Sequence, residues 1–133
     1  MAYKKKVFIS YNYENDRHYK NLLLAWDAHV LFDFSLRDHS ADLSINSTNA
    51  SAVKSVISRY INTATYFLVI VGPKTYKSSW VKWEINKAIE LGKRIIAVKT
   101  DKQNISPEEL LGVGASWAMS FKYVAIINAV NNA

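Results

Sequence analysis

The sequence predicts an α/β fold in which helices cover both faces of a five-stranded parallel sheet. Short β-rich apolar runs alternate with helical stripes along the chain, which is the pattern of strand–helix–strand units with right-handed crossovers. The run from Thr65 to Val71 is continuously apolar, as in a central strand that is covered on both faces. For five such strands the order 2-1-3-4-5 is expected, with the switch point between the first and third strands.

The first half of the chain reads as two strands and two helices. Val7–Tyr11 is a short β-rich run, and the apolar spacing that follows predicts a helix over residues 15–29. Alternation over Leu31–Leu36 predicts the second strand. The polar stretch from Arg37 to Ala50 is rich in Ser, Asn and Asp, which predicts a long loop. The apolar stripe from Val53 to Ile61 predicts the second helix.

The second half continues the alternation after the central strand. Helical spacing predicts a helix over Ser79–Leu91 that ends at Gly92, a residue suited to the left-handed position after a helix. Arg94–Lys99 reads as the fourth strand and Ser116–Met119 as a short fifth strand. A closing helix is expected over residues 123–130.

The composition fits one domain with a packed core. The chain has 133 residues, taken as a single domain over 1–133; half of them are hydrophobic and 21% are charged. No cysteine is present, which excludes disulfides and thiolate metal sites. The basic start leads into only a short apolar run, Val7–Ile9, which is too short for a signal peptide or a membrane span. A cytoplasmic location is therefore expected.

The formal net charge of +6 leaves two interpretations open. One is an anionic partner such as a nucleotide or an acidic protein surface. The other is a solvated basic surface, which is favoured because the Lys and Arg residues are spread along the chain and cluster only at Lys4–Lys6. No nucleic-acid-binding motif occurs, so a nucleic acid is not an expected partner. A membrane is not an expected partner either, because the apolar run at the start is too short to span one.

Several α/β chemistries lack the residues that they need. The P-loop motif G-x-x-x-x-G-K-[ST], the dinucleotide fingerprint G-x-G-x-x-G, H-E-x-x-H and G-x-S-x-G are all absent. The histidines lack metal-ligand spacing, so no metal is expected. A phospho-receiver domain needs acidic residues after its first and third strands, where this chain has Ser10–Asn12 and Val71–Gly72.

The expected ligand crevice lies at the switch point, beyond the carboxyl ends of the first and third strands. The residues at those two ends are Ser10, Tyr11 and Asn12 after the first strand, and Gly72, Pro73 and Lys74 after the third. The helix over residues 79–91 begins from the second of these ends, so its first turns are expected to border the crevice.

Glu84 is the candidate reactive group of that helix. On a helical wheel it lies about 60° from Val81, with Trp80 on the same shoulder, whereas Trp83 points away. Glu84 is thus expected at the seam of the apolar stripe, half covered by Trp80. The alternative left open is a boundary glutamate that is solvated or pairs with a lysine, Lys87 or Lys77. The residues expected to face the sheet are Val81, Ile85, Ala88 and Ile89.

Four segments in order carry a family resemblance. Lys6–Tyr11 (KVFISY) resembles the opening strand of Toll/interleukin receptor (TIR) domains, and Ser79–Ile85 (SWVKWEI) resembles their S-x-W-x-x-x-E-[IL] segment. Phe32–Asp38 (FDFSLRD) is similar to the second strand and loop of the short TIR-like proteins of the bacterial Thoeris anti-phage system. Gly92–Val98 fits that group as well. The resemblance covers most of the chain, up to Val98.

The resemblance implies a flavodoxin-like three-layer sandwich and cleavage of NAD at the nicotinamide–ribose bond. The family's catalytic glutamate maps onto Glu84, and NAD is a substrate rather than a bound cofactor. Tyr11 and Trp80 would stack on a base, while Arg37 and Asp38 would contribute from the loop after the second strand. The remaining residues expected to bind substrate are Ser10, Asn12 and Gly72.

The same resemblance implies a partner reached through a diffusible product. Capture of the ribose by water, by a base nitrogen of the same molecule or by another nucleophile gives ADP-ribose, a cyclic form or a conjugate. In a Thoeris setting the product is a second messenger for a separate effector protein, and residues 37–50 are a candidate surface for self-association. Two alternatives stay open: a non-catalytic interaction module that signals by assembly, and a nucleotide sensor without turnover.

Overall fold

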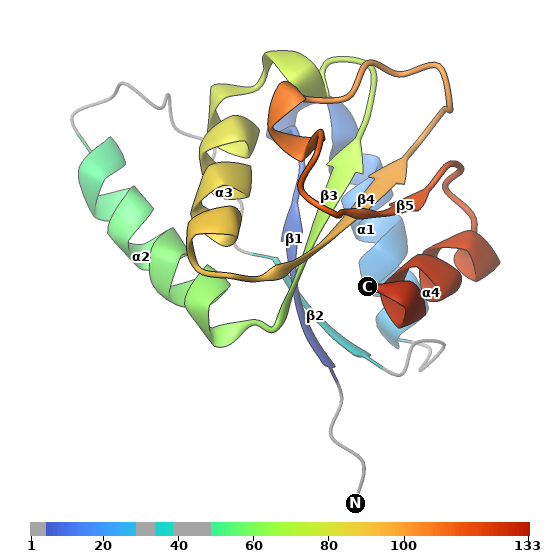
Figure 1. Cartoon of the computed structure of the whole chain (residues 1–133), viewed down its shortest axis with the longest axis horizontal. Coiled ribbons are helices and arrows are strands. Elements are labelled where there is room, and N and C mark those ends of the chain that lie inside the picture. The colour runs from blue at the N-terminus through green and yellow to red at the C-terminus, as the bar shows by residue number, and fades with distance from the viewer. Residues whose placement is uncertain (1–4, 29–33, 39–48) are drawn as a thin grey trace, which may run out of the picture.

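A computed structural model describes residues 5–28, 34–38 and 49–133 of the chain. Its centre is a five-stranded sheet in the order β2-β1-β3-β4-β5, and all four neighbouring pairs are parallel. The predicted fold class, strand order and switch point are therefore confirmed. Figure 1 shows α1 and α4 on one side of the sheet and α2 and α3 on the other.

The strands agree closely with the apolar runs of the sequence. Their bounds are β1 Lys5–Ser10, β2 Phe34–Asp38, β3 Tyr66–Val71, β4 Arg94–Lys99 and β5 Ser116–Ala118. Every residue of β3 is buried, as its uninterrupted apolar run requires.

The helices connect successive strands. Their bounds are α1 Tyr13–Ala28, α2 Ala50–Thr63, α3 Ser79–Glu90 and α4 Tyr123–Asn132, with short 3-10 turns η1 Thr75–Lys77 and η2 Glu108–Leu110. None of the helices in the described ranges combines the length and hydropathy that a bilayer crossing requires.

The predicted end of α3 is confirmed. Gly92 has a φ of 71°, in the left-handed region that glycine adopts without steric cost. Its amide donates to the Ile89 carbonyl at 3.0 Å, and the Lys93 amide donates to the Ala88 carbonyl at 2.9 Å. These two bonds form a Schellman motif, which satisfies carbonyls that the helix leaves open.

Two hydrophobic clusters fill the spaces between the sheet and its helices. Leu23 of α1 and Ile126 of α4 pack on one face of the sheet, and Ile57 of α2 and Ile85 of α3 pack on the other. Along β1 the side chains alternate between the two clusters, so that successive residues reach opposite faces. The buried residues that precede the end of β1 or β3 therefore determine to which face of the sheet the last side chain points.

Two predicted boundaries are wrong for a common reason. Arg37 and Asp38 do not open a loop but end β2, where they pair with Phe8 and Ile9 of β1. Likewise α2 begins at Ala50, three residues before the apolar stripe. In both places backbone hydrogen bonding continues past the apolar pattern, because main-chain hydrogen bonds form whether or not the side chains at an element's end are apolar. Residues 31–33 and 39–48 of the predicted strand and loop lie outside the described residues.

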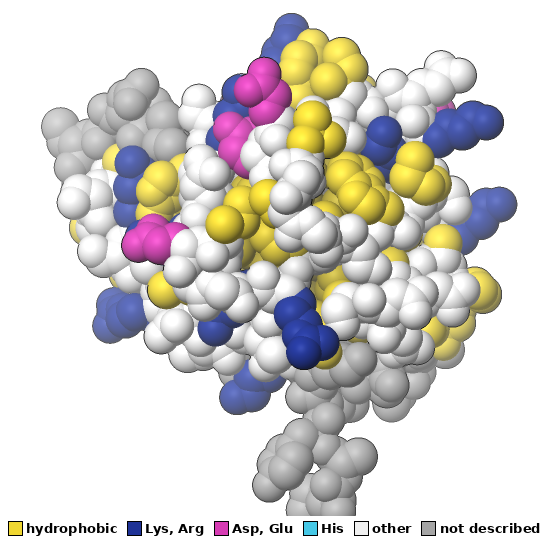
Figure 2. Space-filling model, in the orientation of Figure 1, with side chains coloured by type: hydrophobic (Ala, Val, Ile, Leu, Met, Phe, Trp, Pro, Cys, Tyr) yellow, Lys and Arg dark blue, Asp and Glu magenta, His cyan; other side chains and the backbone are white. Residues whose placement is uncertain are grey.

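Basic side chains are scattered over the visible face of the molecule rather than gathered into one patch (Figure 2). This distribution favours the solvated-surface interpretation of the net charge of +6 over a single anion-binding face on this side.

Phe67→Ala is expected to cost about 3–5 kcal/mol of unfolding free energy. The Phe67 ring is fully buried and stacks on Phe8 of the paired strand, with ring centroids 5.7 Å apart. Denaturant unfolding checks this value. Val124→Ala is the control, since Val124 is 64% exposed and its truncation should change stability by no more than about 0.5 kcal/mol. Comparable losses for the two variants would contradict the assignment of Phe67 to the core.

Candidate active site

The centre of the candidate site is a hydrogen bond between Ser10 and Glu84. The Ser10 hydroxyl donates to Oε1 of Glu84 at 2.7 Å, within the range of a hydroxyl bound to a carboxylate. Ser10 is the last residue of β1, and Glu84 lies in the second turn of α3. The contact therefore stands at the carboxyl end of the sheet, beside the switch point between β1 and β3.

Local structure explains why the two side chains meet. Phe8 points to the face covered by α2 and α3, and Ser10, two residues further, points to the same face. On α3, Val81, Ile85 and Ala88 face the sheet, as the helical wheel predicted. The exception is Ile89, which was expected in that stripe and is 39% exposed, because it lies at the stripe's edge.

Glu84 is more deeply buried than its wheel position predicted. It is 3% exposed rather than half covered, so the alternative of a solvated boundary residue is wrong. Lys87, a predicted partner, forms its ion pair with the exposed Glu90 at 3.0 Å. Burying a carboxyl costs free energy unless donors satisfy its oxygens, and the Ser10 hydroxyl supplies one such donor.

Asn12 holds together the two chain segments that follow β1 and β3. Its Oδ1 accepts from the Glu14 amide at 3.2 Å, which caps the start of α1. Its Nδ2 reaches the Lys74 carbonyl at 3.5 Å, in the segment after β3. The cap also explains why α1 begins at Tyr13 rather than near residue 15. The predicted proximity of the two strand ends is thus present, and Asn12 has a structural role in it.

The two aromatic candidates lie on different faces of the sheet. Tyr11 is 4% exposed and packs in the cluster under α1, with the Lys20 ammonium 5.7 Å from its ring centre. Trp80 is half-buried on the α3 face, with its ring edge-to-face on Trp83 at 5.9 Å. Trp83 does not point into solvent as the wheel suggested, since it packs against the hydrophobic cluster on the α2 and α3 face, with the Lys54 ammonium 5.6 Å from its ring centre. Of the two candidates Tyr11 and Trp80, only Trp80 lies on the same face of the sheet as Glu84.

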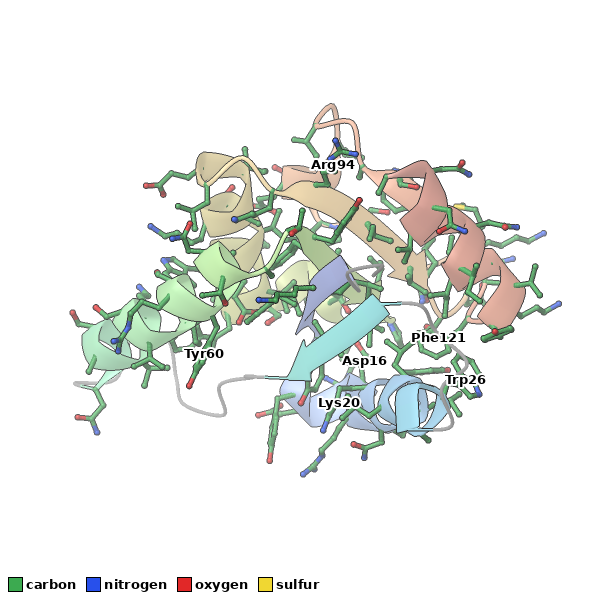
Figure 3. The ribbon with its side chains drawn as sticks, turned by 90° about the horizontal axis from the view of Figure 1, so that it is seen from below. Asp16, Lys20, Trp26, Tyr60, Arg94 and Phe121 are labelled. Carbon is green, nitrogen blue, oxygen red and sulfur yellow. The ribbon has the colours of Figure 1, made fainter. Side chains whose placement is uncertain are left out.

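A second buried carboxyl, that of Asp16, was not predicted from the sequence. It lies on α1, on the side toward the sheet (Figure 3), and is fully buried. The Thr75 hydroxyl lies 3.1 Å from its Oδ2, while Oδ1 has no hydrogen-bond partner among the described residues. Burial raises the pKa of the Asp16 carboxyl, against opposing effects of the Thr75 hydrogen bond and of the nearby His18 charge.

Gly72 is the residue that makes room for Asp16. A Cβ at Gly72 would lie 2.1–2.4 Å from the carboxyl atoms of Asp16, closer than any side chain tolerates. Gly72 is therefore required for packing, whichever part it has in substrate binding. A glycine directly after a buried strand was the available sequence signal for such a close approach.

Arg37 and Asp38 stand at the end of β2, next to β1, so their backbone reaches the same edge of the sheet as Ser10. Their place in substrate binding stays a prediction, as does self-association through residues 37–50, most of which lie outside the described residues. Within residues 5–28, 34–38 and 49–133, no three His, Asp or Glu side chains are grouped so that they could hold a metal ion.

Comparison with known proteins decides the family. The family model described as "Thoeris protein ThsB, TIR-like domain" matches residues 8–105, which include the end of β1, all of β2, β3 and β4, and both buried carboxyls. The chain belongs to the ThsB TIR-like family. The predicted resemblance is thereby confirmed, and the match runs beyond Val98 into the segment after β4.

One curated relative comes from Bacillus cereus (strain MSX-D12) and is named "Putative cyclic ADP-D-ribose synthase ThsB1". It is 29% identical over 102 residues, which make up 71% of this chain and 50% of the relative. This ThsB-family chain thus spans about half the length of that relative.

Solved structures share the fold at low sequence identity. A 2-deoxyribosyltransferase from Bacillus psychrosaccharolyticus has a TM-score of 0.64 at 14% identity, covering 90% of each chain. The CMP N-glycosidase BcmB of Clostridium botulinum has a TM-score of 0.61 at 15% identity, covering 96% of this chain and 99% of its own. The TIR domains of the activated Roq1 resistosome have a TM-score of 0.52 at 14% identity, covering 98% and 86%. These likenesses show the architecture.

Gly72→Ala is expected to destabilise the protein by about 1–3 kcal/mol through overpacking against Asp16. In an Asp16→Ala background the clashing carboxyl atoms are gone, so the same substitution should cost much less. A double-mutant cycle by denaturant unfolding measures this coupling. Additive effects of the two substitutions would show that the close contact does not determine the glycine requirement.

Stability should depend on pH through Asp16. Because its pKa in the folded protein is above 3.8, the folded state binds more protons than the unfolded state in the range above that value. Wild type should therefore lose stability relative to Asp16→Asn as pH rises from about 4, with a slope of at most about 1.4 kcal/mol per pH unit. The difference should level off above the folded pKa.

Unfolding curves from pH 4 to pH 8 measure this difference. His18, on the same helix, is the charged group that acts on Asp16, while Thr75 and Gly72 on the β3 side do not titrate. Glu14→Gln removes an exposed carboxylate from the same turn and separates burial from simple loss of charge. A pH-independent difference between wild type and Asp16→Asn would rule out a raised Asp16 pKa.

Proposed function

We propose that this chain cleaves NAD at the nicotinamide–ribose bond, with Glu84 as the catalytic carboxylate. The observation that carries the proposal is the buried Glu84 side chain, held by the Ser10 hydroxyl at 2.7 Å beside the switch point of the sheet. Membership of the ThsB TIR-like family and the name of the Bacillus cereus relative support the same chemistry.

The reaction needs little acid catalysis. When the bond between the pyridinium nitrogen and ribose C1′ breaks, its electron pair stays with nicotinamide, which leaves as a neutral molecule. Positive charge then develops on C1′ and the ring oxygen of the ribose. A carboxylate fixed next to that position stabilises the charge, and it does so most strongly where water is excluded. The burial of Glu84 provides such surroundings.

Ser10 would fix the orientation of the carboxylate. Its hydroxyl bonds one oxygen, Oε1, and comes from a strand of the sheet rather than from a loop. A reacting group held by the sheet has less freedom to turn away from the developing charge. Trp80, one turn before Glu84 and on the same face, is the stacking candidate for a base of the substrate.

The nucleophile that reaches C1′ determines the product. Water would give ADP-ribose and a proton, and a nitrogen of the same adenine would give a cyclic product. We infer a cyclic or conjugated product because the curated relative is named as a cyclic ADP-D-ribose synthase, although this chain covers only 50% of it. Such a nucleotide would act as a diffusible second messenger on a separate effector protein in anti-phage defence.

Two other functions use the same fold without turnover. The likeness to the TIR domains of the Roq1 resistosome favours an interaction module that signals by assembly. A nucleotide sensor would bind NAD or a related ligand and leave it intact. Both differ from the enzyme in one respect: neither requires the negative charge of Glu84.

Glu84→Gln should abolish nicotinamide release from NAD while the protein stays folded, because the amide keeps the shape and removes the charge. Ser10→Ala should reduce release by roughly tenfold to a hundredfold, since the carboxylate loses an orienting bond. Chromatography of NAD incubated with concentrated protein, or with lysate from phage-infected cells, measures nicotinamide and identifies the second product.

Glu90→Gln is the matched control on the same helix, because Glu90 is exposed and lies away from the sheet. It should release nicotinamide at the wild-type rate. Release by Glu84→Gln at the wild-type rate would exclude catalysis by this residue. Tight NAD binding by wild type without nicotinamide release in either preparation would favour the sensor.

A further inference from the structure

The proposed reaction makes no use of the second buried carboxyl. Asp16 and Glu84 are carried by helices on opposite faces of the sheet, α1 and α3. Asp16 is fully buried and is met by Gly72 and Thr75, which belong to the connection between β3 and α3. This connection is also what places α3, and with it Glu84, relative to the sheet.

The Thr75 side chain is a junction of hydrogen bonds. Its hydroxyl accepts from the Gly72 amide at 2.8 Å and lies 3.1 Å from Asp16 Oδ2 and 3.2 Å from the Ile70 carbonyl. All three groups are buried, so the bonds are protected from water. The Thr75 hydroxyl therefore connects the Asp16 carboxyl of α1 to the backbone at the end of β3, at Ile70 and Gly72.

Further bonds connect Thr75 to the start of α3. The Ser78 amide donates to the Thr75 carbonyl at 2.9 Å, which closes the 3-10 turn η1. The Ser78 hydroxyl then accepts from the Val81 amide at 3.2 Å and caps α3. Glu84 lies less than one turn beyond Val81. The position of the capped first turn therefore determines the position of the Glu84 backbone.

We propose that Asp16 is a positioning residue of the reaction, an inference that rests on the proposed function. Through Thr75, Asp16 fixes the Gly72–Ser78 connection and thereby the position of Glu84. In this arrangement Asp16 acts from α1, which packs on the face of the sheet opposite to α3 and Glu84. Its effect on the reaction passes through the β3–α3 connection alone.

Residue 16 can bond the Thr75 hydroxyl as an acceptor or as a donor. The Thr75 hydroxyl has one proton and two neighbouring acceptors, Asp16 Oδ2 and the Ile70 carbonyl. An ionised carboxyl at residue 16 accepts that proton, whereas a neutral carboxyl donates its own proton and leaves that of Thr75 to Ile70. The amide of Asn can take either part, since it has both an acceptor oxygen and donor N–H groups. Asn at position 16 should therefore preserve the junction, and Ala should not.

The test compares four variants of the full chain: Asp16→Asn, Asp16→Ala, Thr75→Ser and Thr75→Val. Thr75→Ser keeps the hydroxyl, and Thr75→Val keeps the shape without it. The kinetic readout is kcat and KM for nicotinamide release. The structural readout is amide hydrogen exchange of peptides that cover residues 72–84, compared with peptides from β4 and α4. Glu14→Gln, at an exposed position in the same turn as Asp16, is the control.

Asp16→Ala and Thr75→Val are expected to lower kcat by about tenfold or more with little change in KM, because a small displacement of the reacting group impairs the chemical step. Both should raise exchange over residues 72–84 more than in β4 or α4. Asp16→Asn and Thr75→Ser should restore both readouts to near wild type.

Three results would overturn the proposal. In Asp16→Ala and Thr75→Val, equal increases in exchange throughout the protein, with unchanged kcat per folded molecule, would mean that Asp16 contributes only to the overall stability of the fold. Loss of kcat in Asp16→Asn with wild-type exchange would mean that the charge or proton of Asp16 acts directly. Wild-type exchange over residues 72–84 in Thr75→Val would mean that the junction does not hold the connection.

The hydrogen-exchange measurement also distinguishes a failure of the positioning role of Asp16 from a failure of the proposed NAD reaction. If wild type releases no nicotinamide while Asp16→Ala and Thr75→Val still loosen residues 72–84 selectively, the NAD reaction fails but the junction stands. If wild type is active and these two variants match it in both readouts, the positioning role fails and the NAD reaction stands.

Discussion

The hydrogen bond from Ser10 to Glu84 is the interaction on which the site depends. It joins the end of β1 to α3 across 74 residues of sequence. A carboxyl at 3% exposure is unfavourable without donors, so the fold must bring a hydroxyl to it wherever α3 packs. Since Ser10 belongs to the sheet, the orientation of Glu84 is set by the rigid part of the molecule. The same bond is what makes the position suitable for stabilising a developing positive charge.

Much of the fold could be predicted because the signals were local. The apolar run of β3, the strand Arg94–Lys99 and the glycine that ends α3 each depend on residues close in sequence. The alternation of strands and helices predicted a parallel sheet, and the order 2-1-3-4-5 was expected because it is a common one for five such strands. The end of β2 could not be found in this way, because Arg37 and Asp38 continue the strand only by pairing with β1. Polar side chains at a strand end give no sign of that pairing.

The site was predictable in part for the same reason. The helical wheel placed Glu84 beside the stripe that faces the sheet, and spacing alone was enough for that. Its full burial was not predictable, since it depends on packing against residues far away in sequence. Asp16 was missed because an acidic residue in the first turn of a helix is ordinary, as it complements the helix dipole. Its contacts with Gly72 and with Thr75, 59 residues further along the chain, distinguish it from a solvated one.

The two buried carboxyls bear on the choice between enzyme and interaction module. Apolar residues at positions 16 and 84 would satisfy the packing of α1 and α3 and would avoid the desolvation of two acids. A module that signals by assembly uses its surface, and neither carboxyl is on the surface. A reaction through a ribosyl cation needs one carboxylate in a water-poor place and a framework that does not yield around it. In the proposed reaction Glu84 would satisfy the first need, and the bonds from Asp16 through Thr75 to the start of α3 would satisfy the second. The burial of both groups therefore favours chemistry at this edge of the sheet.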